Sequence, residues 1–240
     1  RMTITTLNRM AWMRANAWRK KVMQKNIYEK LIELGLDKKD ILLDEPMKNH
    51  TSFRVGGPAE VFLTCKNEEV LSKVLSFLSN DKVKHLLIGN GSNLLFTDNG
   101  YKGVIVKLAG DFEAIEKIGK SEIKAGSAAL LSKVGAFALT NSLAGMEFAS
   151  GIPGSLGGAT FMNAGAYGGE MKDIIKEVRV MKKDGSEIYI RTADNLDLSY
   201  RHSALQDDEE IVLSVNMELT CDDEVSIKAR MDELAEKRRT

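Results

Sequence analysis

The sequence predicts an α+β fold whose first half begins with a β-α-β unit and whose second half is mostly antiparallel. Residues 60–65 and 85–88 are short apolar runs, and the segment between them repeats its apolar residues at helical spacing. Further along, the strand-like runs 178–182 and 187–191 flank Lys183-Asp184-Gly185-Ser186, which favours a hairpin. These patterns indicate a helical crossover first and antiparallel pairing afterwards.

The composition is that of an ordinary soluble protein. The 240 residues suffice for one large or two small domains, and 43% are hydrophobic against 28% charged. No apolar run approaches the roughly 18 residues of a membrane span, and a net charge of zero gives no case for nucleic-acid binding. Cys65 and Cys221 stand apart from each other and from any histidine cluster. We therefore expect no disulfide and no metal site, and a cytoplasmic location.

The N-terminal segment differs from the rest of the chain. Residues 1–22 carry only basic charges and lack the apolar core of a secretion signal, so we interpret them as a leader or an added upstream segment. Met23 resembles a natural start, because a short amphipathic helix, 27–34, follows it and Gly35 closes that helix. We assign 23–48 to this helix and a linker.

The β-α-β part begins with two β-rich runs, 51–55 and 60–65, joined by the turn Gly56-Gly57-Pro58. Asn67 is placed to cap a following helix. The apolar positions of that helix are Val70, Leu71, Val74, Leu75 and Leu78. The strand 85–88 completes the β-α-β unit.

The turn after this strand, Gly89-Asn90-Gly91-Ser92-Asn93-Leu94, lies where a dinucleotide fingerprint would lie. It is not that fingerprint, because Leu94 replaces the third glycine and the turn 99–103 follows in place of a helix. Several backbone N–H groups of a glycine-rich turn can still point in the same direction, which favours binding of an anion such as a pyrophosphate. Hairpin geometry explains the same residues equally well, and both readings stay open.

After this turn the chain is expected to form strands near 104–108, 115–118 and 122–126. A helix through Leu130 and Leu139 and a late strand, 211–219, are expected after them. The four acids 207–210 are expected to form a solvated loop tip. The last segment, 222–240, has a helical pattern.

The stretch from Met146 to Glu170 is the most unusual part of the chain. It contains Gly151, Gly154, Gly157, Gly158, Gly165, Gly168 and Gly169 with almost no charge. Glycine suits places where backbone turns sharply or touches a ligand. A flexible linker would carry polar spacers, whereas Phe148, Ile152 and Leu156 are interleaved here. We therefore predict a loop that wraps a ligand.

Four blocks taken together resemble the UDP-N-acetylenolpyruvoylglucosamine reductase (MurB) family, in its shorter class. They are Asn49–Ala59, Gly89–Leu95, Gly145–Glu170 and Ser199-Tyr200-Arg201-His202-Ser203, in the family's order, and the resemblance covers about residues 25–240. It implies a vanillyl-alcohol-oxidase or PCMH-type FAD-binding fold, with FAD between the two lobes. The implied domain covers 49–220, with lobes of about 49–108 and 109–220.

The resemblance also implies which residues contact FAD, with Ser155 and Asn163 as candidate polar contacts, although Asn163 could equally cap local backbone. The implied cofactor-binding residues are Gly89, Asn90, Gly91, Ser92, Asn93, Leu94, Ser150, Gly151, Ile152, Pro153, Gly154, Ser155, Gly157, Gly158, Asn163, Gly165 and Ala166.

The family's reaction moves hydride from NADPH, through the flavin, to the enolpyruvyl group of UDP-N-acetylglucosamine-enolpyruvate, a step of peptidoglycan synthesis. Arg201 matches the family's catalytic arginine, whose fixed cation stabilises the enolate-like charge of the transition state. The resemblance assigns the proton donor to a serine and a second acid to a glutamate, both in a C-terminal substrate lobe. We expect 221–240 to begin that lobe and both residues to lie beyond Thr240. Neither His202 nor Ser203 is expected to replace them.

The sequence thus predicts a FAD- and NADPH-dependent reductase, with no prediction of its oligomeric state. Two alternatives remain. One is a FAD-binding fragment or pseudoenzyme without catalysis, and the other is an oxidase of the same flavin fold.

Overall fold

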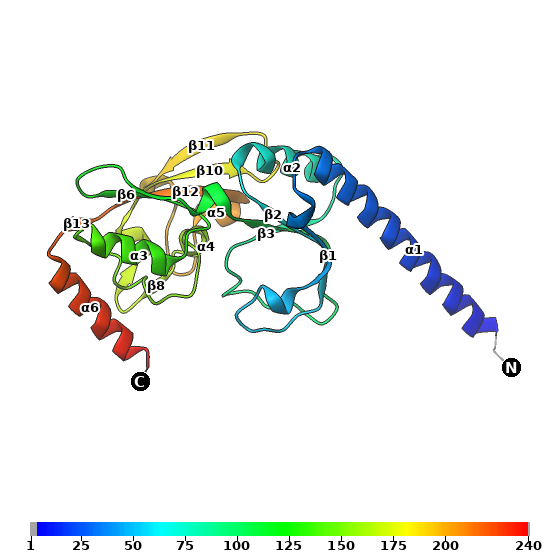
Figure 1. Cartoon of the computed structure of the whole chain (residues 1–240), viewed down its shortest axis with the longest axis horizontal. Coiled ribbons are helices and arrows are strands. Elements are labelled where there is room, and N and C mark those ends of the chain that lie inside the picture. Colours follow the sequence, from blue (N-terminus) through cyan, green and yellow to red (C-terminus); the bar gives the residue numbers. More distant parts are fainter. Residues whose placement is uncertain (1–3, 240) are drawn as a thin grey trace.

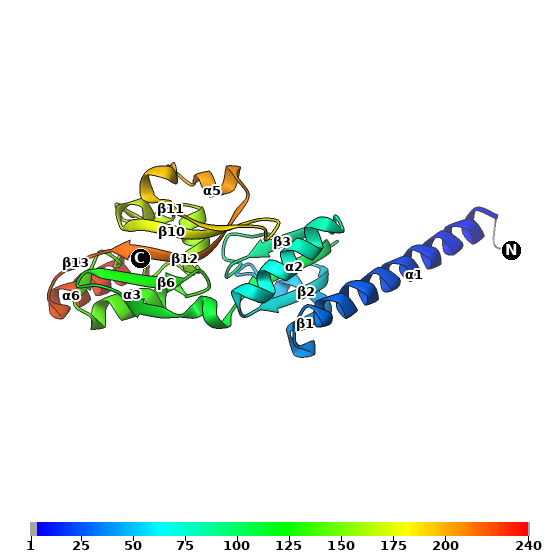
Figure 2. The same cartoon turned by 90° about the horizontal axis from the view of Figure 1, so that it is seen from above.

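The computed structural model describes residues 4–239, which form two lobes side by side with a long N-terminal helix projecting from the first lobe (Figures 1 and 2). The first lobe contains a four-stranded sheet and the second a five-stranded, wholly antiparallel sheet. The predicted α+β class with two lobes is confirmed.

The first sheet has the strand order β1-β2-β4-β3. Its strands are β1 (Ile41–Pro46), β2 (Pro58–Cys65), β3 (His85–Ile88) and β4 (Tyr101–Leu108). Strands β2 and β3 both run parallel to β4, and helix α2 (Glu68–Asn80) connects them. The side chain of Asn67 accepts a hydrogen bond from Val70 N at 2.9 Å, so the predicted cap and β-α-β unit are confirmed.

The predicted strand 51–55 is wrong. These residues form turns, and the antiparallel partner of β2 is β1, which lies inside the segment that the sequence assigned to a linker. Arg54 has φ +53° and Gly56 has φ +125°, and left-handed backbone of this kind cannot continue a strand. The turn folds back instead, with Met47 N donating to Gly57 O at 3.1 Å.

The second sheet has the order β11-β10-β12-β6-β5. Its strands are β5 (Ile115–Lys117), β6 (Glu122–Gly126), β10 (Ile175–Lys182), β11 (Ile188–Thr192) and β12 (Glu210–Glu218). Helices α3 (Leu131–Thr140) and α4 (Leu156–Phe161) share a hydrophobic core with this sheet, to which Leu131, Leu156 and Val178 contribute fully buried side chains. The predicted hairpin of β10 and β11 is confirmed.

Short elements complete the second lobe and the turns between strands. Two small ribbons pair β7 (Leu143–Ala144) with β13 (Thr220–Cys221), and β8 (Gly165–Ala166) with β9 (Gly169–Glu170). The remaining helices are α5 (Ala204–Asp207) and α6 (Glu224–Lys237), with 3₁₀ turns at Lys38–Asp40, Met47–Asn49, Gly110–Glu113, Met171–Asp173 and Ala193–Asn195.

Helix α2 fastens the two lobes together. Ser72 Oγ donates to Gly185 O at 2.8 Å and Ser76 Oγ donates to Asp184 O at 3.0 Å, both in the β10–β11 hairpin. Glu68 also receives two hydrogen bonds from Arg179 of β10. Buried residues of both sheets pack in one core beneath these contacts. The relative position of the lobes is therefore fixed by packing as well as by polar contacts.

Helix α1 runs from Ile4 to Glu33, so it extends well upstream of the predicted 27–34 helix. The segment contains no glycine or proline to end a helix, and termination comes at Gly35 with φ +105°. No helix within residues 4–239 combines the length and apolar content of a bilayer span.

The predicted loop tip 207–210 is wrong at its last residue. Glu210 begins β12, and its side chain is 1% exposed. Arg191 Nε lies 2.7 Å from Glu210 Oε2, and the Tyr189 hydroxyl donates to the same carboxylate. This pairing supplies the opposite charge and hydrogen bonds that a buried carboxylate requires.

The turn after β3 is held by close backbone contact. Ser52 N donates to Gly91 O at 3.2 Å, and Gly91 has φ +68°. A Cβ atom at residue 91 would lie 1.9 Å from His50 O, so only glycine fits.

Alanine at residue 91 is expected to lower the free energy of unfolding by at least about 2 kcal/mol more than alanine at residue 168. Both glycines have positive φ, but a Cβ atom at Gly168 would meet nothing within 4 Å. Gly168→Ala thus carries the backbone penalty without the collision. Urea unfolding of both variants measures the difference, and equal losses would contradict the predicted collision.

The two cysteines are expected to differ in reactivity. Cys65 is 1% exposed, and burial raises the pKa of its thiol to about 11, whereas Cys221 is exposed. Because the thiolate is the nucleophile, a thiol reagent at pH 8 should modify one cysteine in the native chain and two after unfolding. The variant Cys221→Ser should show no reaction in the native state. Rapid modification of two thiols in the folded wild type would contradict this expectation.

Candidate functional site

The turn 89–94 and the glycine-rich segment, far apart in sequence, meet in the structure. Asn90 Nδ2 donates to Pro153 O at 3.1 Å. A Cβ atom at Gly89 would lie 2.4 Å from Ser155 Oγ, and one at Gly154 would lie 3.7 Å from Ser92 Oγ. The two segments that the sequence singled out therefore face each other across the junction of the lobes.

Several backbone N–H groups at this junction have no acceptor among residues 4–239. They belong to Asn90, Gly91, Ser92, Asn93 and Leu94 on one side, and to Gly151 and Ser155 on the other. Free N–H groups on a glycine-rich turn can bind an anion. The residues present therefore fit a phosphate-bearing cofactor.

The glycine-rich segment is fixed to the loop between β6 and α3. Leu156 N donates to Ala129 O and Gly157 N donates to Ser127 O, each at 2.8 Å. A Cβ atom at Gly157 would lie 2.7 Å from Ser127 Cβ. This glycine thus permits close packing, so a role in the backbone scaffold explains it without a ligand contact.

The other predicted cofactor-binding residues are spread over several elements. Ser150 to Ser155 lie in the loop before α4, Gly158 lies in α4, and Gly165 and Ala166 form β8. A Cβ atom at Gly165 would lie 2.7 Å from Glu170 Cγ. No hydrogen bond within residues 4–239 joins β8 to the turn 89–94, so a ligand contact from Gly165 or Ala166 stays a prediction.

The side chain of Asn163 is occupied by local contacts. Its Nδ2 donates to Glu170 Oε2 at 2.8 Å and to Ser199 O at 3.0 Å, while its Oδ1 accepts from Lys172 N at 2.9 Å. The hydrogen bond from Lys172, and then that from Asn163, lower the pKa of the Glu170 carboxyl. Of the two roles that the sequence left open for Asn163, these contacts favour capping of local backbone.

Arg201 lies at the tip of a tight turn that Asn163 supports. Ser199 and His202 exchange two backbone hydrogen bonds of 3.2 Å, which leaves Tyr200 and Arg201 exposed between them. Arg201 has φ +58°, an uncommon conformation that costs about 1–2 kcal/mol for a residue with a side chain. Its guanidinium has no hydrogen bond or ion pair within the described residues. The turn therefore presents an unpaired cation.

Ser203, which the sequence analysis named without this role, and Gln206, which it missed, attach this turn to the end of α4. Ser203 Oγ donates to Phe161 O at 2.7 Å and Gln206 Nε2 donates to the same oxygen at 2.8 Å. Their S-x-x-Q spacing is a common helix-capping pattern, but neither side chain caps α5 here. Sequence spacing alone could have located a helix start but not this anchor.

His202 is held by acids. Its Nε2 lies 3.3 Å from Asp207 Oδ2 and 3.9 Å from Asp197 Oδ2. His202 therefore lies between two carboxylates at the base of the turn.

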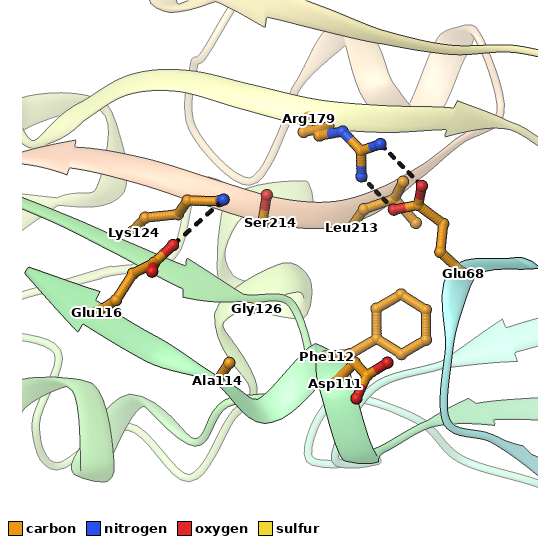
Figure 3. Close-up of a pocket in the computed structure, with 10 residues that line it drawn as sticks. All are labelled: Glu68, Asp111, Phe112, Ala114, Glu116, Lys124, Gly126, Arg179, Leu213 and Ser214. Carbon is orange, nitrogen blue, oxygen red and sulfur yellow. Dashed lines mark hydrogen bonds and ion pairs between the residues drawn. The ribbon is translucent and has the colours of Figure 1, made fainter. Parts of the chain in front are cut away.

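A separate pocket of about 350 Å³ opens where α2 meets the second sheet (Figure 3). Both of its cations are already paired: Arg179 with Glu68, and Lys124 Nζ with Glu116 Oε1 at 3.2 Å. None of its lining residues belongs to the predicted site. We therefore place the candidate site at the facing glycine-rich segments.

Comparison with known proteins identifies the family to which the chain is similar. Residues 59–191 match the model of the family described as "FAD binding domain". The chain is 46% identical over 215 residues to the UDP-N-acetylenolpyruvoylglucosamine reductase of Clostridioides difficile (strain 630), covering 90% of the chain and 70% of the relative. It is 41% identical over 217 residues to the reductase of Caldanaerobacter subterraneus subsp. tengcongensis, with the same coverage.

Among solved structures, the chain is similar to UDP-N-acetylenolpyruvylglucosamine reductase (MurB) from Thermus caldophilus. The TM-score is 0.71 at 32% identity, over 83% of this chain and 68% of that one. These matches confirm the PCMH-type FAD-binding fold. The facing glycine-rich segments, the fold and the relatives together show that the chain belongs to the MurB family of FAD-binding reductases.

Proposed function

We propose that the protein reduces UDP-N-acetylglucosamine-enolpyruvate to UDP-N-acetylmuramate with NADPH, in the synthesis of peptidoglycan precursors. The observation that carries this proposal is the contact of Asn90 with Pro153, which joins the two glycine-rich segments next to the free N–H groups of residues 90–94. Family membership supplies the reaction and the substrate class. The chain covers 70% of the length of the C. difficile relative, so the proposal concerns the whole protein.

The cofactor would be held at both segments. The free N–H groups of residues 90–94 would bind the pyrophosphate of FAD, and residues 150–155 would lie along the cofactor on the facing side. When bound, FAD supplies the hydride transfer between NADPH and the enolpyruvyl group. The rigid attachment of Leu156 and Gly157 to the β6–α3 loop orients the second segment and limits the entropy lost on binding.

Arg201 would act on the substrate. An enolate-like charge develops beside the substrate carboxylate during hydride addition, and a fixed cation there stabilises the transition state more than the ground state. The guanidinium is unpaired, and its turn is anchored at Ser199, Ser203 and Gln206. The anchors fix the backbone from which the Arg201 side chain extends.

A FAD-binding protein without turnover is the second candidate. The sequence neighbours of Arg201 are Tyr200, which is 91% exposed, and His202, whose ring lies beside Asp207 and Asp197. No proton donor is thus assigned to the described part of the chain. Oxidation of NADPH that depends on the enolpyruvyl sugar distinguishes the reductase from this candidate, and oxygen-dependent turnover without the sugar would indicate an oxidase.

The chain is expected to take up FAD and to become yellow, and Asn90→Ala should weaken the affinity about fivefold. The variant loses the contact to Pro153, which is worth about 1 kcal/mol. Quenching of FAD fluorescence measures both dissociation constants. Asn99→Ala is the matched control, because Asn99 is exposed and its side chain makes no hydrogen bond within the described residues. A chain that binds no FAD would overturn the proposed function.

Replacing Arg201 with alanine is expected to separate the two half-reactions. Reduction of bound flavin by NADPH should keep its rate, whereas reoxidation by the enolpyruvyl sugar should slow about 100-fold, because one charge-stabilising donor is lost. Stopped-flow absorbance follows both steps. Arg239→Ala is the control, since Arg239 is an exposed arginine outside the turn. An unchanged reoxidation rate in Arg201→Ala would remove Arg201 from the mechanism, and a wild type that is not reoxidised would favour the non-catalytic candidate.

A further inference from the structure

Helix α6 lies beside α3 in the second lobe, and its last residues reach the glycine-rich segment (Figure 1). Arg230 Nε donates to Glu147 Oε1 at 2.9 Å, and its Nη2 donates to Asp222 Oδ2 at 2.7 Å. Eight residues and about 12 Å further along the helix, Arg238 Nη2 donates to Phe148 O at 2.7 Å. One face of α6 therefore contacts the segment at two separate points.

The guanidinium of Arg238 fills the space above Gly151. A Cβ atom at residue 151 would lie 1.4 Å from Arg238 Nη1, so any other residue there would displace the arginine. The Arg238 side chain, which follows the last residue of α6, thus occupies the space that a Cβ atom at residue 151 would need. The sequence could not reveal this, because the two residues are far apart in the chain.

Arg238 also holds a second part of the glycine-rich segment. Its Cζ lies 5.2 Å from the centroid of the Tyr167 ring, in the geometry of a cation–π contact. Tyr167 has φ +54° and its side chain is 48% exposed. A single side chain therefore connects Phe148, Gly151 and Tyr167.

Most hydrogen-bonding capacity of Arg238 is unused. A guanidinium carries five N–H donors, and within the described residues only Nη2 has an acceptor, Phe148 O. The N–H group of the adjacent Gly151 is free as well. The surface around Gly151 thus offers donors and positive charge, which suits a ligand rich in acceptors.

We propose that Arg238 is a positioning residue of the cofactor site, which holds residues 148–151 and Tyr167 in the conformation that binds FAD. The inference rests on the proposed function, because it assumes that this segment contacts FAD. It extends the site to a helix that lies outside the region 59–191 matched by the FAD-binding family model. Cofactor affinity then depends on the docking of α6.

The first test compares Arg238→Ala with Arg239→Ala. The two arginines are neighbours at the end of the same helix, but Arg239 is exposed and makes no side-chain contact within the described residues. Fluorescence titration should show FAD binding weakened about tenfold in Arg238→Ala and unchanged in Arg239→Ala. The FAD affinity of Arg238→Lys should lie between those of the two alanine variants, because lysine keeps a cation near Tyr167 but lacks the planar guanidinium.

Thermal unfolding of the FAD-free chains separates positioning from simple stabilisation. A merely structural contact would lower the unfolding temperature of Arg238→Ala and leave the FAD dissociation constant of the folded chain unchanged. A positioning role predicts a changed dissociation constant at a temperature where circular dichroism shows both chains folded. Equal FAD affinity of wild type and Arg238→Ala overturns the inference while the proposed function stands.

Gly151→Ala provides a second and independent test. It should weaken FAD binding in the wild type by displacing the guanidinium, and have a clearly smaller effect when Arg238 is already alanine. Additive effects of the two substitutions would overturn the inference. If the wild-type chain binds no FAD at all, the proposed function fails and this inference fails with it.

Discussion

Close approach of the backbone to neighbouring atoms, which only glycine permits, is the constraint on which the site depends. A Cβ atom at Gly89 would collide with the Ser155 hydroxyl, and one at Gly91 would overlap the carbonyl of His50. The lack of a side chain at Gly89 lets the turn after β3 lie against the segment before α4, where Asn90 donates to Pro153, 63 residues away in sequence. The tight turn also leaves the N–H groups of residues 90–94 without a backbone carbonyl acceptor among the described residues.

Much of the fold could be predicted from local patterns. The cap at Asn67, the apolar face of α2 and the hairpin around Gly185 depend on residues close in sequence, and all three appear in the structure. The missed strand β1 depends on pairing with β2, which propensity does not record. Likewise, Glu210 looked solvated because its partner Arg191 belongs to another strand. Errors arose where tertiary contacts override local preference.

For the site, the sequence located the two glycine-rich segments and Arg201, but not the contacts that position them. Ser203 and Gln206 look like an ordinary helix start, yet both donate to Phe161 O. Asn163 looked like a ligand contact as much as a cap, and its three hydrogen bonds lie within the protein. Polar side chains can serve either purpose, and spacing along the chain does not distinguish them.

The connectivity of the second sheet has a consequence for how the chain acquires its structure during synthesis. Strand β6 pairs with β12, so Gly126 cannot pair until Ser214 has been synthesised. All strands of the first sheet, by contrast, are complete by Leu108. The first sheet can therefore assemble on the ribosome while the second is still missing a central strand. The segment carrying Gly151 to Gly158 lies within this interval and stays without its final support until β12 emerges. Such non-local pairing is intrinsically slow, and the nascent second lobe is the part of the chain that most needs protection from aggregation.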